Sequence, residues 1–270
     1  MSPMAVAAPT RGATFQRIKL VEAETVRSVP YPLEPDFPEK GWVRLYVWEW
    51  PVRITHWVIV LSIVVLTVTG TYLYFPFLHS KPSHQFVTGT MRFTHEVTGF
   101  VFIAALIVRF YWFFAGNEWA RWPQFLPIGR TRWRALWEQT AYYVFLRRTP
   151  PFEVGHNPLA GATYIVIYVL MIVEVLTGLA LLQHVNPNKM LGHFINWLPA
   201  LISWRYIREI HFFVMMALWA FFIHHVYSAA LIGIEEKSGL VASIFTGYKF
   251  FVGKRLNEEA RREREAALRQ

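Results

Sequence analysis

The sequence predicts an all-α membrane protein built as a bundle of four transmembrane helices. Hydrophobic residues fill 54% of the 270 positions and mean hydropathy is +0.28, so the chain is more apolar than an average soluble domain. In addition, four segments are apolar over the roughly 20 residues that a helix needs to cross a bilayer. We place these spans near 53–76, 95–115, 161–183 and 209–233.

The segment before the first span, residues 1–41, is expected to be an extended or disordered cytoplasmic tail. It has four prolines between positions 30 and 38 and lacks the apolar core of a secretory signal peptide. The membrane domain is expected to cover 42–253. A charged cytoplasmic tail, 254–270, follows it, and the mixed charges of this tail are typical of a solvated helix.

Aromatic residues near the predicted ends of the spans support their placement, because tryptophan and tyrosine prefer the membrane interface. They are Trp48, Trp50, Trp57, Tyr72, Tyr74, Trp112 and Trp204. The loop 116–160 is expected to add an amphipathic helix at the cytoplasmic surface. Its stretch RTRWRALWEQTAYYVFLRR repeats apolar residues at roughly helical spacing between arginines, a pattern of interfacial helices.

The distribution of Lys and Arg predicts the orientation of the bundle. Residues 1–53, 116–160 and 234–270 hold 21 of these cations, whereas 76–94 and 184–208 hold 5. Cytoplasmic segments are enriched in Lys and Arg, so both termini and the middle loop are expected in the cytoplasm. We call the cytoplasmic side inner and the opposite side outer.

Composition also limits the chemistry. No cysteine is present, which excludes disulfides, thiolate-bound iron–sulfur clusters and covalent c-type haem. The net charge of +9 occurs in many nucleic-acid-binding proteins, but here the basic residues flank apolar segments. Membrane lipid is therefore an expected partner and nucleic acid is not.

Four histidines lie within the predicted helices: His56, His95, His211 and His225. From His211 to His225 an α-helix turns about 1400°, about 40° short of four full turns, and rises about 21 Å. These two imidazoles therefore share one face at two depths. The neighbouring His224 points about 140° away from His211 by the same geometry, which makes it the weaker ligand candidate.

Chain direction predicts how these histidines pair. Helices two and four run the same way, so His95 and His211 lie together at the outer side, and we call them the outer pair. Helix one runs the opposite way, which places His56 beside His225 as the inner pair. Two facing imidazoles are suitable axial ligands for a haem iron, and the flat apolar ring fits between helices. The pattern predicts two haem b groups and electron transfer across the membrane.

Two other interpretations of these histidines remain open. They are hydrogen-bonding groups between packed helices, or they bind zinc, although a structural zinc site gathers four ligands at one depth and these histidines are divided two and two. Gly70 shares the face of His56 at the outer depth, where a missing side chain lets a porphyrin approach the backbone. Close helix packing explains this glycine equally well.

Two charged residues within the spans are further candidates. Arg109 is positioned either to contact a haem propionate or to extend to the cytoplasmic surface. Glu174 in helix three is a functional candidate because carboxylates within membranes are costly, with proton handling as one possible role and no partner visible in the sequence.

At these residues the chain resembles the b-type cytochrome subunit of membrane-bound nickel–iron uptake hydrogenases. The matching segments are VRITHW around His56, MRFTHE around His95, VGHNPLAG at 154–161, EIH ending at His211 and HHVY at 224–227. The resemblance runs from about Trp42 to about Gly253. The similar cytochrome b subunits of formate dehydrogenases share the diheme four-helix plan, but VGHNP and the aromatic loop before it favour the hydrogenase type.

The resemblance implies an electron-transfer subunit that performs no hydrogen chemistry itself. A hydrogenase pair, a small iron–sulfur subunit and a large nickel–iron subunit, donates electrons to an outer haem on His95 and His211. An inner haem on His56 and His225 then reduces a membrane quinone, with His156, His224 and Arg109 as possible neighbours of the quinone. The whole is expected to be part of an oligomeric complex.

Three function classes stay open from the sequence. The first is the hydrogenase subunit. The second is a cytochrome b that serves another dehydrogenase, such as formate dehydrogenase, or a free-standing diheme b561-like oxidoreductase. The third is a membrane scaffold or transporter without redox function, in which the histidines only pack.

Overall fold

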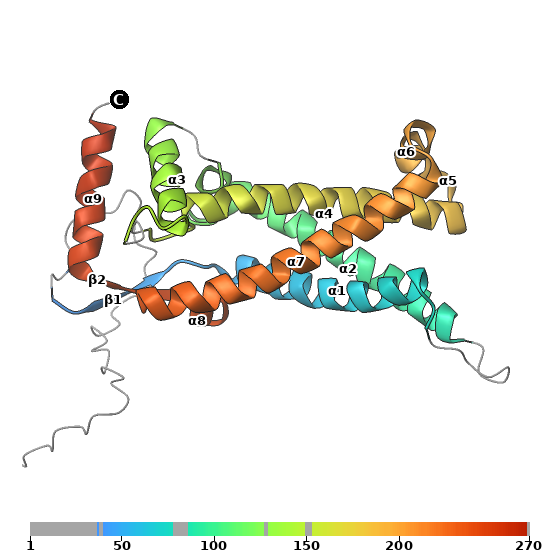
Figure 1. The fold of residues 1–270 in the computed structure, drawn as a ribbon, viewed down its shortest axis with the longest axis horizontal. Coiled ribbons are helices and arrows are strands. Elements are labelled where there is room, and N and C mark those ends of the chain that lie inside the picture. Colours follow the sequence, from blue (N-terminus) through green and yellow to red (C-terminus); the bar gives the residue numbers. More distant parts are fainter. Residues whose placement is uncertain (1–36, 38–39, 78–85, 127–128, 149–152, 269–270) are drawn as a thin grey trace, which may run out of the picture.

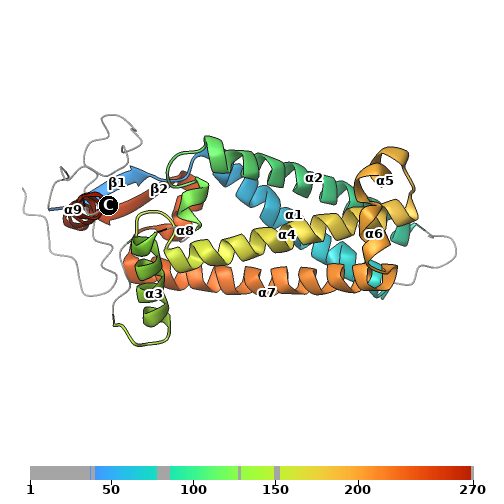
Figure 2. The ribbon, with the colours of Figure 1, turned by 90° about the horizontal axis from the view of Figure 1, so that it is seen from above.

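Four long helices dominate the computed structural model, which describes residue 37 and residues 40–77, 86–126, 129–148 and 153–268. These helices are α1 (Trp50–Tyr74), α2 (Val87–Ala115), α4 (Pro158–Val185) and α7 (Trp204–Glu236), and they lie alongside one another (Figures 1 and 2). Each is long and apolar enough to cross a membrane. The predicted all-α transmembrane bundle is therefore confirmed.

Each of the four helices begins before the apolar span from which it was predicted. α2 begins at Val87, eight residues before the predicted start, and so includes the charged Arg92. α4 begins at Pro158, where the side chain of Asn157 accepts a hydrogen bond from the amide of Ala160 at 2.7 Å, an N-terminal cap followed by a proline in the first turn. Hydropathy detects only the apolar part of a helix, whereas caps and turns determine where it ends.

The bundle consists of two helical hairpins, α1 with α2 and α4 with α7. A layer of buried apolar side chains joins the hairpins midway along the bundle. It includes Ile59 from α1, Phe102 from α2, Met171 from α4 and Leu218 from α7. Large apolar side chains such as Phe213 are instead exposed on the outside, as expected for a surface that lipid covers.

A two-stranded sheet closes one end of the bundle, which we call the sheet end. β1 (Trp42–Tyr46) comes directly before α1, and β2 (Tyr248–Val252) follows α7 and the short helix α8 (Leu240–Thr246). The strands are antiparallel, with Trp42 opposite Val252 and Tyr46 opposite Tyr248. Since paired strands must lie on the same side of a bilayer, an even number of crossings separates them, in agreement with four spans.

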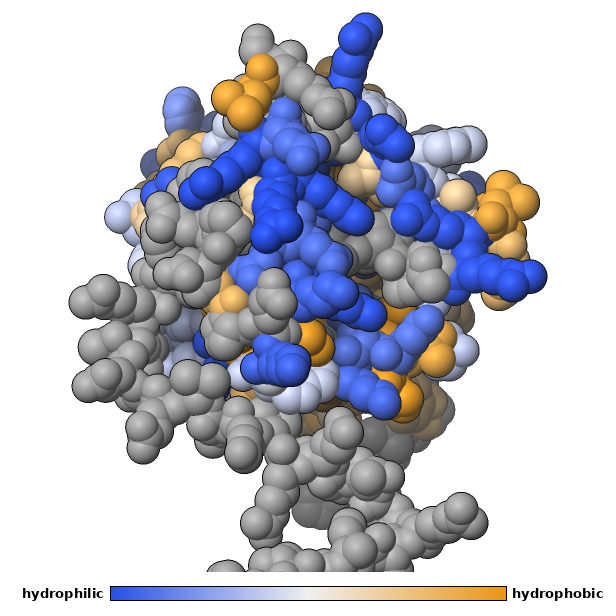
Figure 3. Space-filling model, turned by 90° about the vertical axis from the view of Figure 1, so that its left-hand side faces the viewer, coloured by the Kyte–Doolittle hydropathy of each residue, from blue (hydrophilic) through white to orange (hydrophobic). Residues whose placement is uncertain are grey.

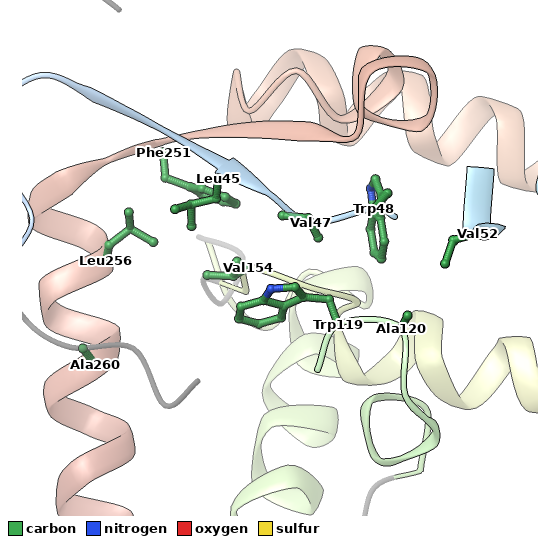
Figure 4. Close-up of a cluster of buried hydrophobic side chains, with 10 residues drawn as sticks. All are labelled: Leu45, Val47, Trp48, Val52, Trp119, Ala120, Val154, Phe251, Leu256 and Ala260. Carbon is green, nitrogen blue, oxygen red and sulfur yellow. The ribbon is translucent and has the colours of Figure 1, made fainter. Parts of the chain in front are cut away.

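Apolar side chains from distant segments pack beneath this sheet (Figure 4). Leu45 and Phe251 of the strands contact the same buried cluster as Trp119 and Val154, which come from the two ends of the middle loop. Trp48 also donates a hydrogen bond from its indole Nε1 to the Ser243 hydroxyl at 3.0 Å. The sheet end is therefore a small packed unit attached to the bundle.

The last helix, α9 (Gly253–Ala267), lies across the sheet end rather than along the bundle (Figure 1). The C-terminal run is helical as expected, but it is not a freely solvated helix. Leu256 and Ala260 on one face are fully buried in the cluster under the sheet. Its other face contributes to the mainly hydrophilic surface of the sheet end (Figure 3).

Shorter elements complete the fold. The middle loop contains the 3-10 turn η1 (Trp122–Gln124) and the helix α3 (Arg130–Tyr143), which crosses the direction of the bundle as an interfacial helix does. Trp133 and Trp137 on α3 are exposed. At the opposite end, α5 (Lys189–Ile195) and α6 (Trp197–Leu201) connect α4 to α7.

Lys249 of β2 holds the middle loop against the sheet. Its ammonium donates hydrogen bonds to the carbonyl oxygens of Val154 and Gly155 at 2.9 and 3.3 Å, and the residue is 3% exposed. Burial lowers the pKa of this amine from 10.5 to about 8, although Glu236 and Glu153 oppose the shift. Folding therefore buries a cation that is more easily deprotonated than in the unfolded chain.

This lysine is expected to make stability rise with pH. Below about pH 8 the amine is charged in both states, and folding bears the full cost of burying it, roughly 3 kcal/mol. Between its folded and unfolded pKa values the folded protein releases the proton first, so that cost decreases as pH rises. In detergent, thermal unfolding from about pH 7 to about pH 10 should show this gain for the native chain and not for Lys249→Met.

The matched control is Lys254→Met, which removes an exposed lysine from α9. The stability of this variant should rise with pH as much as the stability of the native chain does. If the stability of Lys249→Met rose with pH as much as that of the native chain, the buried Lys249 amine would not be the cause of the rise.

Candidate functional site

The two histidines of the outer pair face each other, one from each hairpin. His95 comes from α2 and His211 from α7, and their ring centres lie 6.3 Å apart. An iron held by one nitrogen of each ring needs about 2 Å on each side, as in other metal–imidazole bonds, plus about 1 Å from each nitrogen to its ring centre, which makes roughly 6 Å. The spacing of the outer pair fits a metal ion between two imidazoles.

Each outer histidine is oriented by a threonine from the other helix of its hairpin. The Thr69 hydroxyl lies 2.9 Å from Nδ1 of His95 and donates its own hydrogen to the carbonyl of Val65 at 2.8 Å. Because that hydrogen is already engaged, the hydroxyl accepts the Nδ1–H of the imidazole. The unprotonated Nε2 of His95 is then free to bind a metal.

The second hairpin repeats this arrangement. The Thr177 hydroxyl lies 2.9 Å from Nδ1 of His211 and donates to the carbonyl of Val173 at 2.7 Å. The same tautomer follows for His211, again with Nε2 as the free nitrogen. Both members of the outer pair are therefore prepared as neutral ligands.

The glycine after each threonine leaves room for the histidine ring. A Cβ added at Gly70 would meet Cε1 of His95 at 3.1 Å, and one added at Gly178 would meet Cε1 of His211 at 3.1 Å. Both glycines line a cavity of about 670 Å³ that also contains His95 and His211, a volume within the usual range of cofactor pockets. Gly99, which also follows a threonine, differs because a Cβ added there would meet nothing within 4 Å.

Glu174 of α4, for which the sequence showed no partner, lies beside His211. One of its carboxylate oxygens, Oε1, lies 3.4 Å from Nδ1 of His211, while Oε2 is buried without a hydrogen bond from the described residues. Glu174 also lines the outer cavity. Its carboxyl group is thus a second polar neighbour of the His211 ring, beside the Thr177 hydroxyl.

The inner pair is arranged with the same spacing nearer the sheet end. The rings of His56 on α1 and His225 on α7 have their centres 6.4 Å apart. The Tyr164 hydroxyl of α4 lies 3.4 Å from Nδ1 of His225, and Phe221 stacks on the same ring at 5.5 Å. Nδ1 of His56 is buried without a partner among the described residues.

The outer pair fits haem better than zinc or simple packing, and the inner pair has the same spacing. Each offers two imidazoles at the spacing of a two-ligand metal, and the outer pair opens into a cavity with apolar walls. No group of three or more metal-binding side chains occurs in the part of the chain that the structure describes, whereas structural zinc requires four ligands. His224 is exposed and lies 3.3 Å from the Ser228 hydroxyl, away from the inner pair.

An aromatic cluster adjoins the inner pair. His156 packs against Trp48, Phe125 and Tyr164 at ring-centre distances of 4.7, 4.8 and 5.3 Å. Arg109 is buried near the same cluster, 4.3 Å from the ring centre of Phe113 and 5.5 Å from that of Phe125. Its Nη1 donates to the carbonyl of Ala120 at 3.5 Å, so this guanidinium does not extend to the surface.

Burial lowers the pKa of His156 well below its ordinary value, and the positive charges of Arg109 and Lys249 lower it further. The imidazole is therefore neutral at physiological pH. Its Nδ1 atom is buried and has no hydrogen-bond partner among the described residues.

Sequence reasoning did not identify Thr69, Thr177 or Tyr164 as partners of the histidines. Of these segments the sequence pointed only to Gly70, because a threonine in a helix normally bonds to its own backbone and gives no signal of a partner on another helix. The second bond of each threonine, to a histidine on another helix, depends on packing between helices.

Comparison with known proteins places the chain among membrane cytochromes. A model of the family "Prokaryotic cytochrome b561" matches residues 47–247. The "Probable Ni/Fe-hydrogenase 1 B-type cytochrome subunit" of Escherichia coli (strain K12) is 31% identical over 226 residues, which cover 80% of this chain and 96% of that protein. Similarly named proteins of Azotobacter vinelandii and Bradyrhizobium diazoefficiens are 31% and 32% identical over 77% and 78% of this chain and 89% and 88% of their own length.

The glycine beside His95 offers a test of the cavity. In Gly70→Val the new side chain would press on the His95 ring. If the outer pair binds a haem, the purified variant should hold less haem than the native chain, as measured by the b-type absorbance per protein. Gly89→Val is the control, because a Cβ at Gly89 meets nothing within 4 Å. Equal absorbance in both variants would argue against a cofactor at the outer pair.

Proposed function

Because the chain belongs to the prokaryotic cytochrome b561 family, together with the B-type cytochrome subunits of Ni/Fe-hydrogenases, we propose that it carries electrons from a hydrogenase to a membrane quinone. The observation that carries this proposal is the presence of two facing histidine pairs at two depths of one bundle. A haem b on each pair supplies the one-electron steps that connect the two sides of the membrane.

The residues of this chain prepare those two sites. Thr69 and Thr177 hold the outer imidazoles in the neutral tautomer with Nε2 free, and Tyr164 lies against Nδ1 of His225. The apolar layer around Ile59 and Leu218 keeps water out between the two levels.

We place the bundle in a bacterial inner membrane with both termini in the cytoplasm. Cations concentrate in residues 1–53, 116–160 and 234–270, and the pairing of β1 with β2 brings both flanks of the bundle to one side. By the positive-inside rule that side is the cytoplasm. The inner pair therefore lies towards the cytoplasm and the outer pair towards the donor.

The names of the relatives support the choice of donor. They are called subunits of Ni/Fe-hydrogenase, so we expect a peripheral enzyme with an iron–sulfur subunit and a nickel–iron subunit on the outer side. Hydrogen oxidation there yields two electrons and two protons. This subunit accepts the electrons singly and performs no hydrogen chemistry.

Purification of the tagged chain from its native membranes tests this proposal. We expect nickel and two further polypeptides to co-purify, with two haems per chain by absorbance after dithionite reduction. His225→Ala should hold one haem, whereas the adjacent His224→Ala should keep two. Molybdenum or tungsten in place of nickel would favour a formate dehydrogenase, and a preparation without b-type absorbance would refute the relay.

We further propose that the quinone binds at the aromatic cluster around His156. Nδ1 of the neutral His156 imidazole has no partner among the described residues, so it can accept a hydrogen bond from the hydroxyl of the reduced quinone. Tyr164 contacts both His156 and His225, which gives a short path from the inner pair. Arg109 lies within the same cluster, whereas the exposed His224 lies outside it. Full reduction of the quinone takes up two electrons and two protons.

The exchange His156→Phe keeps an aromatic ring in the cluster and removes the nitrogen. We expect quinone reduction to slow on the order of 100-fold, the usual contribution of a positioned acid or base, while dithionite still reduces the haems. His224→Ala should leave quinone kinetics as in the native chain. Unchanged quinone kinetics in His156→Phe would place the quinone elsewhere.

A further inference from the structure

Two arginines stand in the same relation to the two members of the outer pair. Arg92 comes three residues before His95 on α2, and Arg208 comes three residues before His211 on α7. Three residues rise about 4.5 Å and turn about 300° on a helix, so each arginine lies one turn closer to the helix start, near the face of its histidine. Both arginines line the 670 Å³ cavity that contains the outer pair.

Neither guanidinium is engaged within the part of the chain that the structure describes. The nearby Arg205 pairs with Glu209 at 2.9 Å, which leaves Arg208 without a hydrogen bond or an ion pair there. Arg92 is likewise unpaired among the described residues. Glu96 and Glu174 also line the cavity, but neither forms an ion pair with these arginines. The cavity therefore carries two available cations.

The arginines near the inner pair are used differently. Arg53 also comes three residues before a histidine, His56, but it is buried and its Nη1 donates to the carbonyl of Phe245 at 2.6 Å. Its guanidinium also lies over the Trp50 ring, 3.9 Å from the ring centre. Arg109 is committed in a similar way to Ala120 and Phe113. An arginine three residues before a histidine is thus a structural residue at the inner pair, whereas the two arginines in this position at the outer pair are free among the described residues.

A flat apolar cofactor with a charged edge suits such a cavity. Haem b has two propionate side chains on one edge of an otherwise apolar ring, and a carboxylate buried beside apolar walls requires a cation or strong donors. Guanidinium groups bind carboxylates with two parallel hydrogen bonds, which gives both affinity and direction. One cation from each hairpin matches the number of propionates.

We propose that Arg92 and Arg208 bind the two propionates of the haem at the outer pair. This inference rests on the proposed function, because it requires a haem on His95 and His211. The two guanidinium groups direct the propionate edge towards the start of α2 and α7, which is the end facing the electron donor. They also link the two hairpins at that level, since each hairpin then contributes one axial ligand and one cation.

The charge of the arginines has a consequence for the haem potential. Negative propionates favour the oxidised haem, which carries one more positive charge than the reduced form, and arginine offsets this effect. Removal of either arginine should therefore lower the potential of the outer haem. A tenfold shift of a one-electron equilibrium towards the oxidised form corresponds to about 59 mV, and we expect a shift of several-fold to tenfold for each arginine.

Redox titration of the intact complex tests the proposal in Arg92→Gln and Arg208→Gln. The outer haem is identified as the component that His211→Ala removes. Its potential should fall in both variants while that of the inner haem stays unchanged. Arg205→Gln is the control: it removes a charge of the same helix that pairs with Glu209 and does not line the cavity, so the potential of the outer haem should stay closer to that of the native chain.

Infrared difference spectra between the oxidised and reduced states give a direct readout. With haem carrying ¹³C in its propionate carboxyl groups, the carboxylate bands should shift in Arg92→Gln and Arg208→Gln and not in Arg205→Gln. Arg92→Lys and Arg208→Lys keep the positive charge, so the potential of the outer haem should stay closer to the native value in these variants than in the glutamine variants. If the glutamine variants assemble poorly, the lysine variants still allow the potential to be compared. Two bound haems with native potentials and unshifted bands in both glutamine variants would overturn the propionate assignment alone, whereas a native preparation without haem would overturn the proposed function itself.

Discussion

The geometry of the outer pair depends on one constraint, the need of a buried imidazole nitrogen for a partner. In an apolar environment an unpaired polar group costs several kcal/mol, about 2–7 kcal/mol by transfer experiments, so one nitrogen of a histidine cannot simply face hydrocarbon. At the outer pair, Thr69 and Thr177 occupy one nitrogen of each ring. The other nitrogen then points across the bundle, towards the second hairpin and the cavity between them. Both the helix pairing and the choice of free nitrogen follow from this arrangement.

The two hairpins solve this problem in parallel ways. In each, a Thr-Gly dipeptide on one helix meets a histidine on its partner, with the hydroxyl as acceptor and the glycine as space. The repeat breaks down at the inner pair, where Tyr164 replaces a threonine and Nδ1 of His56 has no described partner. Glu174 breaks it at the outer pair, since it stands beside His211 only. Two sites built from the same elements therefore differ in their polar neighbours, and hydrogen bonding near an axial ligand is one of the factors that tune a haem potential.

Much of this plan was predictable from the sequence because helical periodicity and hydropathy are local. The four spans, the helix in the middle loop and the pairing of His95 with His211 and His56 with His225 follow from counting residues and from chain direction. The contacts between α1 and α2 at Thr69, and the burial of Lys249 under the middle loop, join segments that the sequence separates widely. The β1–β2 sheet was missed for the same reason, since a strand of five residues beside a long apolar helix gives no periodic signal of its own.

The pairing of β1 with β2 also orders the assembly of the molecule in time. About two hundred residues, including all four long helices, separate Tyr46 from Tyr248. During synthesis the first strand has no partner until the last helix has entered the membrane, and contacts between such distant segments form late because closing long loops is slow. Trp48, Leu45 and the buried face of α9 become covered only at that moment. A chain that stalls before residue 248 therefore keeps an unpaired strand and an uncovered apolar patch at the end of the bundle, and such unfinished packing favours aggregation and proteolysis.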